Sequence, residues 1–111
     1  MSVVSERIKE LLQRHILVKD AAIGTSLIGS RRDILPEMVS VPEPQRVVDM
    51  YKASINAGAT LLTTNTFLSD PLSLKSCGVD ITTEEVVAAT MSAIREACQE
   101  CEKEIFVMGS I

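Results

Sequence analysis

The stretch LLTTNTF, from Leu61 to Phe67, decides which kind of fold this chain can adopt. Its first half, two leucines followed by two β-branched threonines, is typical of a buried strand. Its second half brings an amide, a hydroxyl and an aromatic ring without a turn glycine. Polar groups cost free energy when they are buried without a partner, so Asn65 and Thr66 need either partners within the protein or a ligand.

The composition is that of one small globular domain. The chain has 111 residues, of which 46% are hydrophobic and 23% charged, with a net charge of −4. We expect no nucleic-acid partner, because no basic patch with interleaved aromatic residues is present. We expect no membrane association and a cytoplasmic location, because the sequence has neither a signal peptide nor an apolar run near the ~20 residues that span a bilayer. Three cysteines, an odd number, favour reduced thiols.

Amphipathic segments alternate with short apolar ones along the chain. Residues 1–15 predict a leading helix capped by Ser5, and residues 29–43 predict a loop. A second helix is expected from Pro44 to a stop at Gly58, and a third after the capping box of Thr82 and Glu85, ending near residue 103. The third helix is expected to turn its apolar side inward (Val86, Val87, Thr90, Ile94 and Ala97). The expected strands are residues 16–18, 60–64 and 105–108.

This order predicts an α/β fold in which residues 16–111 form a strand–helix–strand–helix–strand unit. Apolar strands separated by amphipathic helices indicate a parallel sheet with right-handed crossovers. Ligands of such sheets bind at the carboxyl ends of the strands, which here are residues 20–25, 65–67 and 109–110. We therefore expect Asp20, Asn65, Thr66 and Phe67 to line one shared site. The alternatives are that Asn65 and Thr66 cap the turn that follows them, and that Asp20 caps its own loop.

Other motifs in the sequence carry less weight. Gly24 and Gly29 have the spacing of a phosphate-binding loop, but the required lysine is missing, so nucleotide binding is disfavoured. Cys98 and Cys101 form a C-x-x-C pattern near the end of a helix without a second pair of ligands, which favours ordinary helix cysteines over a metal or redox site. His15 precedes the first strand and is expected at the opposite end from the site.

Three segments in order resemble the homocysteine S-methyltransferases. Residues 16–25 resemble the first strand of that family, which usually reads Asp-Gly-Ala-Met-Gly-Thr. Residues 57–67 are similar to the second strand, where Ala-Gly-Ala precedes Thr-Asn-Thr-Phe. Residues 107–111 are similar to the third strand, which normally continues into Gly-Pro. The resemblance spans nearly the whole chain from Ile16 onward.

The resemblance implies a fold and a chemistry. The fold is an eight-stranded (β/α) barrel, of which this chain would supply the first three strand–helix units, leaving the barrel incomplete. The reaction moves a methyl group to the thiol of homocysteine and forms methionine. The donors of the family are S-methylmethionine, betaine, or a methylcorrinoid supplied by a folate, and a zinc ion held by three cysteines of later strands binds the thiol as thiolate. Asp20 matches the position that helps to hold the amino group of the substrate.

The pocket wall implied by the resemblance has five further members (Gly24, Thr25, Asn65, Thr66 and Phe67). No catalytic residue and no metal ligand can be assigned, because the cysteine motifs of the family are absent and the three cysteines present lie in other motifs. Ala21 stands where the family usually has glycine. We expect the chain alone to be inactive, as the amino-terminal part of a zinc-dependent methyltransferase.

A second class of function stays open: a non-catalytic module that binds or complements a partial barrel or a corrinoid-carrying partner. A flavodoxin-like domain is a more distant alternative. Because three strands cannot close a barrel, the strand at residues 105–108 is expected to present an unpaired edge, beside apolar side chains of Val18, Leu61 and Val107 that lack a covering wall. We therefore expect the isolated chain to be marginally stable and to associate through that edge, either with itself or with the remaining part of a barrel.

Overall fold

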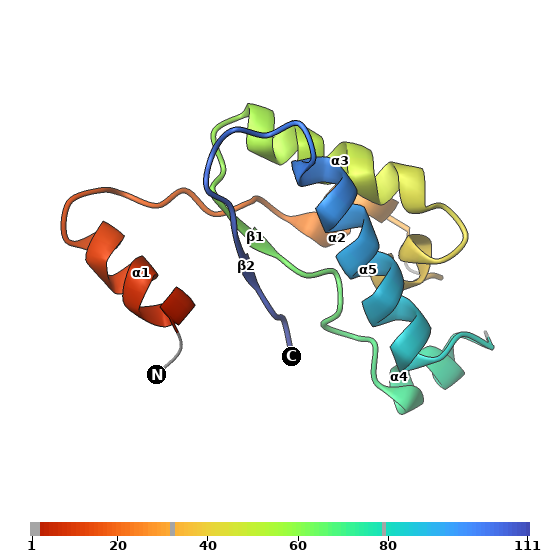
Figure 1. The fold of residues 1–111 in the computed structure, drawn as a ribbon. Helices are drawn as coiled ribbons and strands as arrows, with labels where there is room; N and C mark the ends of the chain where they lie inside the picture. The colour runs from red at the N-terminus through yellow and green to blue at the C-terminus, as the bar shows by residue number, and fades with distance from the viewer. Residues whose placement is uncertain (1–2, 32, 79) are drawn as a thin grey trace.

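The computed structural model describes residues 3–31, 33–78 and 80–111. Within them, the chain forms several helices and two short strands (Figure 1). In chain order the elements are α1 (Val3–Leu12), α2 (Ile23–Ile28), the 3-10 helix η1 (Pro36–Ser40), α3 (Pro44–Asn56), β1 (Leu61–Thr63), α4 (Pro71–Ser76), α5 (Thr83–Cys98) and β2 (Phe106–Met108). The predicted α/β class with parallel pairing is confirmed.

The sheet is small, and β1 is its centre. Strands β1 and β2 pair in parallel, with Leu61 opposite Phe106. Lys19 forms an isolated parallel bridge to Leu61. The backbone groups of Leu61 bond to Val18 and Asp20, whereas the carbonyl of Thr60 accepts from Phe106, so these two neighbours lie on opposite edges of β1. The sheet order therefore agrees with three successive parallel segments, of which the first is reduced to a bridge.

The prediction of a strand at residues 16–18 is wrong. Ile16 is 92% exposed and Val18 is 49% exposed, so neither side chain gains the burial that favours a strand. Backbone pairing begins only at Val18, where the carbonyl accepts from Thr60 at 2.9 Å and from Leu61 at 3.2 Å. The described residues thus contain a small parallel α/β sheet, but not three complete strand–helix units.

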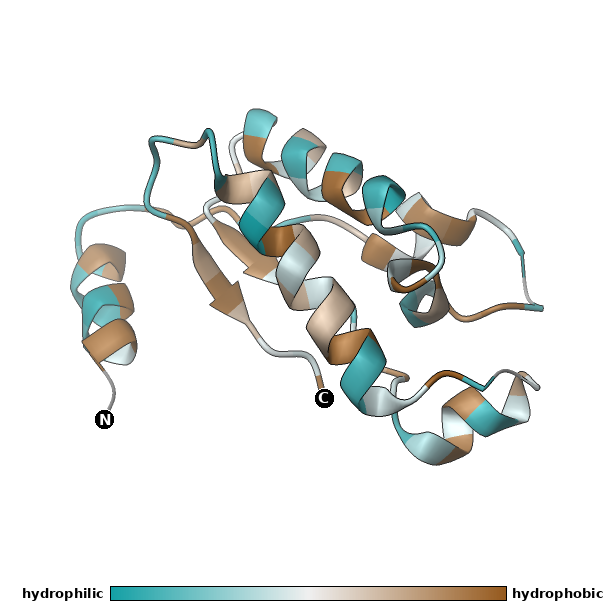
Figure 2. Ribbon diagram, turned by 45° about the vertical axis from the view of Figure 1, so that its right-hand side comes forward, coloured by the Kyte–Doolittle hydropathy of each residue, from teal (hydrophilic) through white to brown (hydrophobic). Residues whose placement is uncertain are grey.

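The hydrophobic core lies between α3, α5 and β1. Helices α3 and α5 run side by side and cover the sheet, with apolar residues on the faces that meet (Figures 1 and 2). The core residues of these three elements are Val47, Val48, Tyr51, Ile55, Leu62, Ala93, Ile94 and Ala97. Burial of each larger side chain contributes roughly 1.5–3 kcal/mol, so this contact is the main source of stability.

Helix boundaries follow local signals in the sequence. The side chain of Thr82 accepts from the backbone N–H of Glu85 at 3.1 Å, which confirms it as the N-cap of α5. Pro44 occupies the first turn of α3, and Gly58 follows its C-cap with a φ of 112°, a value that L side chains rarely adopt. Asp70 caps α4, an element that the sequence reasoning did not assign.

Three expectations about the helices are corrected. Helix α5 ends at Cys98 instead of near residue 103, because the chain must turn back for Phe106 to pair with β1. Val87 is exposed, not inward, since it lies on the flank of that helix. Ser5 lies inside α1, two residues after its start, and is not its cap.

Within residues 20–31 and 33–43 the chain forms two short helices, α2 and η1, where a turn followed by a loop was expected. Leu27 is buried in the core and Ile23 and Ile28 pack against it, so this apolar face holds α2 in place. Pro36 starts η1, whose Val39 is also buried. Both short helices contain few apolar residues, and the neighbouring glycines, prolines and charged residues favoured a loop. The sequence pattern therefore did not predict these helices.

Helix α1 lies apart from the rest of the chain (Figures 1 and 2). None of its described residues is fully buried. Arg7 forms ion pairs with Glu104 at 3.3 Å and with Glu10 at 3.4 Å, all three side chains being largely exposed. Exposed pairs of this kind contribute little stability, so α1 is loosely attached.

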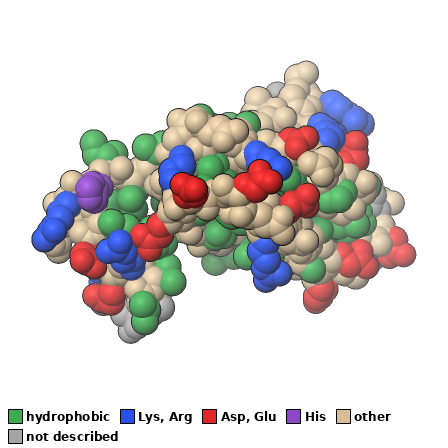
Figure 3. Space-filling model, turned by 45° about the horizontal axis from the view of Figure 1, so that its top comes forward, with side chains coloured by type: hydrophobic (Ala, Val, Ile, Leu, Met, Phe, Trp, Pro, Cys, Tyr) green, Lys and Arg blue, Asp and Glu red, His purple; other side chains and the backbone are tan. Residues whose placement is uncertain are grey.

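Charges of both signs are mixed over the surface that Figure 3 shows. Among the described residues no helix has both the length and the apolar character that a membrane span requires.

Candidate functional site

A cleft of about 470 Å³ opens at the carboxyl ends of the parallel segments. Its lining comes from the segment after the Lys19 bridge, the start of η1, the end of β1 and the end of the chain. The lining residues are Lys19, Asp20, Ala21, Ala22, Ile23, Gly24, Pro36, Glu37, Thr63, Thr64, Asn65, Thr66, Phe67, Leu68 and Ser110. Five of the six predicted site residues are therefore brought together at one cleft.

Asp20 joins the first parallel segment to β1. Its side chain is only 1% exposed. One carboxylate oxygen, Oδ2, accepts from the backbone N–H of Thr63 at 2.9 Å, and the other, Oδ1, accepts from the Thr63 hydroxyl at 3.0 Å. Lys19 Nζ also lies 3.4 Å from Oδ1. Both oxygens of Asp20 thus have partners within the protein, and neither serves to cap its own loop.

Asn65 connects β1 to η1 and α5. Its side chain is buried, and its Nδ2 donates to the carbonyl of Pro36 at 2.9 Å and to Ser40 Oγ at 3.0 Å. The buried hydroxyl of Thr90 in α5 donates to the same Ser40 oxygen at 3.0 Å. The amide of Asn65 therefore holds η1 in place across the core, and does not cap the turn that follows it.

Thr66 connects the same end of β1 to the end of the chain. Its hydroxyl donates to the carbonyl of Ser110 at 2.8 Å and lies 2.8 Å from the hydroxyl of Thr64. The Thr64 hydroxyl in turn accepts from the backbone N–H of Ser110 at 3.0 Å. The two threonines thus fix the segment after β2 as one side of the cleft.

The remaining predicted residues differ in their placement. Phe67 lines the cleft but is 61% exposed, so its ring offers an apolar surface at the mouth. Gly24 also lines the cleft, and a Cβ atom there would lie 3.3 Å from Pro36 Cγ, a close approach that favours glycine. Thr25 is exposed and borders a separate hollow beside α2, with Gly29 and Arg31, outside the lining of this cleft.

Glu37 is a residue of the cleft that the sequence reasoning missed. It follows Pro36 in the first turn of η1 and is buried, with 5% of its surface exposed. Its Oε1 accepts from the backbone N–H of Leu68 at 3.1 Å. Its Oε2 is shielded from water and has no hydrogen-bond partner among the residues that the structure describes. The available signal was an acidic residue inside the apolar run from Leu35 to Val39.

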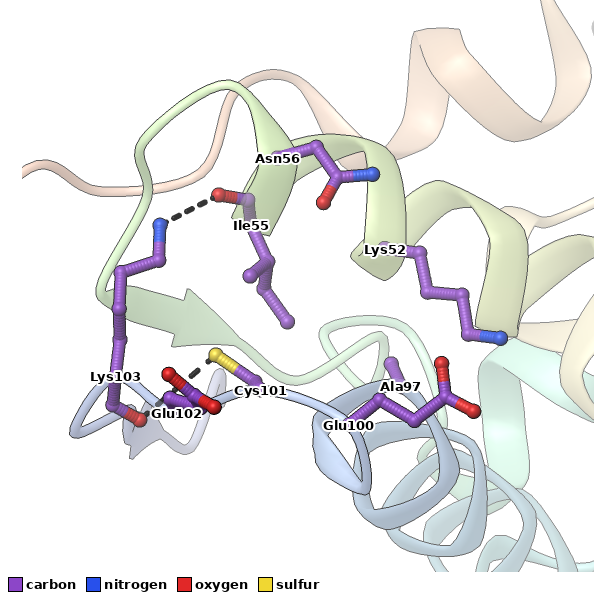
Figure 4. Close-up of a pocket in the computed structure, with 8 residues that line it drawn as sticks. All are labelled: Lys52, Ile55, Asn56, Ala97, Glu100, Cys101, Glu102 and Lys103. Carbon is purple, nitrogen blue, oxygen red and sulfur yellow. Dashed lines mark hydrogen bonds between the residues drawn. The ribbon is translucent and has the colours of Figure 1, made fainter.

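A second concavity, of about 460 Å³, lies at the other end of the sheet (Figure 4). It is bordered by the carboxyl ends of α3 and α5 and by the turn that leads into β2. Lys103 Nζ donates to the carbonyl of Ile55 at 2.8 Å, and the Cys101 thiol lies 3.8 Å from the carbonyl of Lys103 (Figure 4). Lys103 and the Cys101 thiol are thus directed at the backbone, which indicates a structural role for these two side chains.

The cysteines do not form a metal site in the part of the chain that the structure describes. No group of three or more Cys, His, Asp or Glu side chains there could hold a metal ion. Cys77, Cys98 and Cys101 are free thiols. Burial, followed by the proximity of Cys101, raises the pKa of the Cys98 thiol and disfavours the thiolate that a zinc ligand must provide. The described residues therefore do not fit zinc.

The comparisons with known proteins agree with this geometry. The profile of the homocysteine S-methyltransferase family matches residues 17–111. No curated protein matches the chain, whereas nine chains of solved structures do. One of these is the homocysteine methyltransferase MmuM from Escherichia coli in its metallated form, with a TM-score of 0.74 and 20% sequence identity.

That similarity covers 94% of this chain and 40% of the MmuM chain, so this chain spans less than half the length of that enzyme. The similarity of the two structures shows that the fold of this chain resembles part of the fold of that enzyme. The family match extends over most of the sequence and includes every residue of the cleft. The chain belongs to the homocysteine S-methyltransferase family.

Proposed function

We propose that the cleft at the carboxyl ends of the parallel segments is one wall of a pocket for homocysteine. The observation that carries this proposal is the convergence of Asp20, Asn65, Thr66 and Phe67 on one cleft, within a chain whose family match covers them all. The carboxylates of Asp20 and Glu37 give the cleft a negative character that suits the ammonium group of an amino acid.

In this proposal the residues of the chain bind and orient the substrate. Asn65 and Thr66 hold the walls through their bonds to η1 and to Ser110. The exposed ring of Phe67 covers the apolar methylene groups of the substrate. Asp20 fixes the loop that carries Gly24, and its buried charge favours a nearby ammonium group.

We further propose that the complete protein moves a methyl group to the homocysteine thiol and acts in the cytoplasm, where reduced cysteines are stable. The proposal includes zinc and a methyl donor of the sulfonium, betaine or methylcorrinoid type. Membership of the family is the only support for both. The described residues include no group of side chains suited to the metal, so we assign none of them to the methyl transfer itself. The 111-residue chain is proposed to be inactive by itself.

Binding is tested by NMR titration of the chain with L-homocysteine under reducing conditions. We expect amide shifts to change at Asp20, Thr63–Phe67 and Ser110. The concavity at Lys52–Asn56 is an internal control, and its shifts are expected to stay constant. The same samples, given S-methylmethionine, are expected to form no methionine above background. Shifts confined to the control concavity would contradict the proposed site.

A further inference from the structure

Cys98 and Cys101 stand at the carboxyl end of α5, where the chain leaves the helix and turns toward β2. Their spacing alone favoured ordinary helix cysteines, but the structure adds the geometry of the turn and a concavity beside it. We propose that the two residues are a redox-sensitive pair, which a small disulfide converts reversibly into an intramolecular disulfide that fixes the end of α5.

The backbone holds the two cysteines within the range of a disulfide. The N–H of Cys101 donates to the carbonyl of Cys98 at 3.0 Å, which closes a turn across the two residues between them. A turn of this kind brings its first and last Cα atoms to less than about 7 Å, and disulfides span Cα separations of roughly 4.4–6.8 Å. Both side chains also pack against the same hydrophobic core. Disulfide formation therefore requires rotation of side chains and no change of the fold.

The two thiols differ in their access to an incoming molecule. Cys101 lines the concavity of about 460 Å³ in Figure 4, whereas Cys98 is not part of that lining. The Cys101 thiol contacts the carbonyl of Lys103 at 3.8 Å, and this contact is readily exchanged because a thiol is a weak donor. Cys101 is therefore the thiol that meets a small disulfide first, and Cys98 is the thiol that completes the exchange.

The border of the concavity has charges of both signs. Lys52 and Lys103 contribute ammonium groups, and Glu100 and Glu102 contribute carboxylates. Disulfides of amino acids and small peptides carry both kinds of charge, and charge-assisted bonds to such a border favour their approach. The oxidant of the pair is therefore assigned to this chemical class.

The reaction is a double thiol–disulfide exchange. The thiolate of Cys101 attacks one sulfur of the small disulfide, whose S–S bond breaks, and the other half leaves as a thiolate. The thiolate of Cys98 then attacks the Cys101 sulfur of this mixed disulfide and releases the second half as a thiolate. The two protons that the cysteines lose are taken up by the two released thiolates. The pair is oxidised by two electrons, and the small disulfide is reduced to two thiols.

The environment of Cys98 stabilises the product. Burial, followed by the proximity of Cys101, raises the pKa of the Cys98 thiol. A thiol with a raised pKa is a poor leaving group, so a reductant that attacks the accessible sulfur of Cys101 expels Cys98 slowly. The oxidised pair is thus expected to persist until a dithiol reductant reverses it.

The test incubates the 111-residue chain with oxidised glutathione and measures free thiols and mass under non-reducing conditions. We expect the loss of two of the three thiols, a mass lower by two hydrogen atoms, and full reversal by dithiothreitol. Trypsin cuts after Arg95 and Lys103 and so releases both cysteines in one peptide, which is expected to contain the new bond.

Three variants separate the roles of the cysteines. Cys98→Ser is expected to stop at the mixed disulfide, with one glutathione on Cys101. Cys101→Ser is expected to react more slowly, because Cys98 does not line the concavity. Cys77→Ser is the matched control and is expected to form the disulfide as the wild type does. Cys77 is the C-cap of α4, which lies beside the start of α5 and not its end (Figure 1).

The wild-type chain decides the proposal even if a variant does not fold. Three unreacted thiols, a glutathione adduct that persists on Cys101, or a bond that includes Cys77 would each overturn it. The same reaction in urea measures what the fold contributes, and the equilibrium constant for the disulfide is expected to be larger in the native chain. Equal constants in the native and unfolded chains would show that the pair is not held for oxidation by the structure, and would also overturn the proposal.

Discussion

Thr63 is the residue at which the site and the core meet. Its backbone N–H and its hydroxyl both donate to Asp20, and its carbonyl accepts from the hydroxyl of Tyr51 at 2.8 Å. Burial, and secondly the negative charge of Asp20, raise the pKa of Tyr51 well above its ordinary value. The neutral phenol is therefore part of the folded state.

Tyr51 should make the stability of the chain dependent on alkaline pH. In the unfolded chain its pKa is about 10, so above that pH the unfolded state loses a proton that the folded state retains. The contribution of Tyr51 is complete below about pH 10 and is lost as pH rises beyond it. Tyr51→Phe is expected to cost about 1 kcal/mol at neutral pH and to remove this part of the alkaline loss.

Urea unfolding from pH 7 to 11 measures this effect, with absorbance at 295 nm reporting on the single tyrosine. Parallel pH profiles for the wild type and Tyr51→Phe would contradict the assignment.

At the scale of single residues, the sequence predicted which side chains meet at one cleft, but not the partners of those side chains. Strand order was enough to bring Asp20 and Asn65 to one cleft, because the carboxyl ends of parallel segments converge. It could not show that both side chains bond within the protein, since Thr63 and Ser40 become their neighbours only in the folded chain. Glu37 was missed for the same reason, because its hydrogen-bond partner, the backbone N–H of Leu68, lies 31 positions away in the sequence.

At the scale of elements, the sequence correctly predicted the helix ends that depend on neighbouring residues alone. The cap of Thr82 and the glycine after α3 depend on residues within one turn, and both were correctly predicted. The strand at residues 16–18 was not, because a strand forms only where a partner continues alongside it, and pairing here starts at Val18. The short helices α2 and η1 depend on burial of Leu27 and Val39 against distant helices.

Thr82→Ala tests the contribution of a cap at this scale. The substitution leaves the backbone N–H of Glu85 without its side-chain acceptor. It is expected to lower the free energy of unfolding by about 1 kcal/mol, and Thr82→Ser, which keeps the hydroxyl, by only a few tenths. Thermal unfolding followed by circular dichroism measures both. Equal losses in the two variants would show that the methyl group of Thr82, and not its hydroxyl, is what stabilises α5.

At the scale of the whole molecule, the sheet is covered on one side and narrow. Within the described residues β2 pairs with β1 alone, and Val18, Val107 and Met108 are substantially exposed. A parallel edge beside exposed apolar residues is a template for pairing with another chain. We expect the apparent mass of the chain to rise with concentration in light scattering.

Met108→Lys should suppress this association, because a lysine on an edge strand opposes the approach of a second strand. Met108→Ala is the matched control and keeps the edge uncharged. A wild-type chain that remains a monomer across the accessible concentration range would show that the edge is not a site of association. Equal association of Met108→Lys and Met108→Ala would lead to the same conclusion.

The bridge from Asn65 through Ser40 to Thr90 has a mechanical consequence. Thr90 belongs to α5 and is absent from the lining of the cleft, yet it is bonded to the helix that carries Glu37. A rotation or sliding of α5 would therefore be transmitted to the acidic wall of the cleft without any contact between that helix and a ligand. A partner that packs on the far side of α5 and shifts this helix would thus change the shape of the pocket.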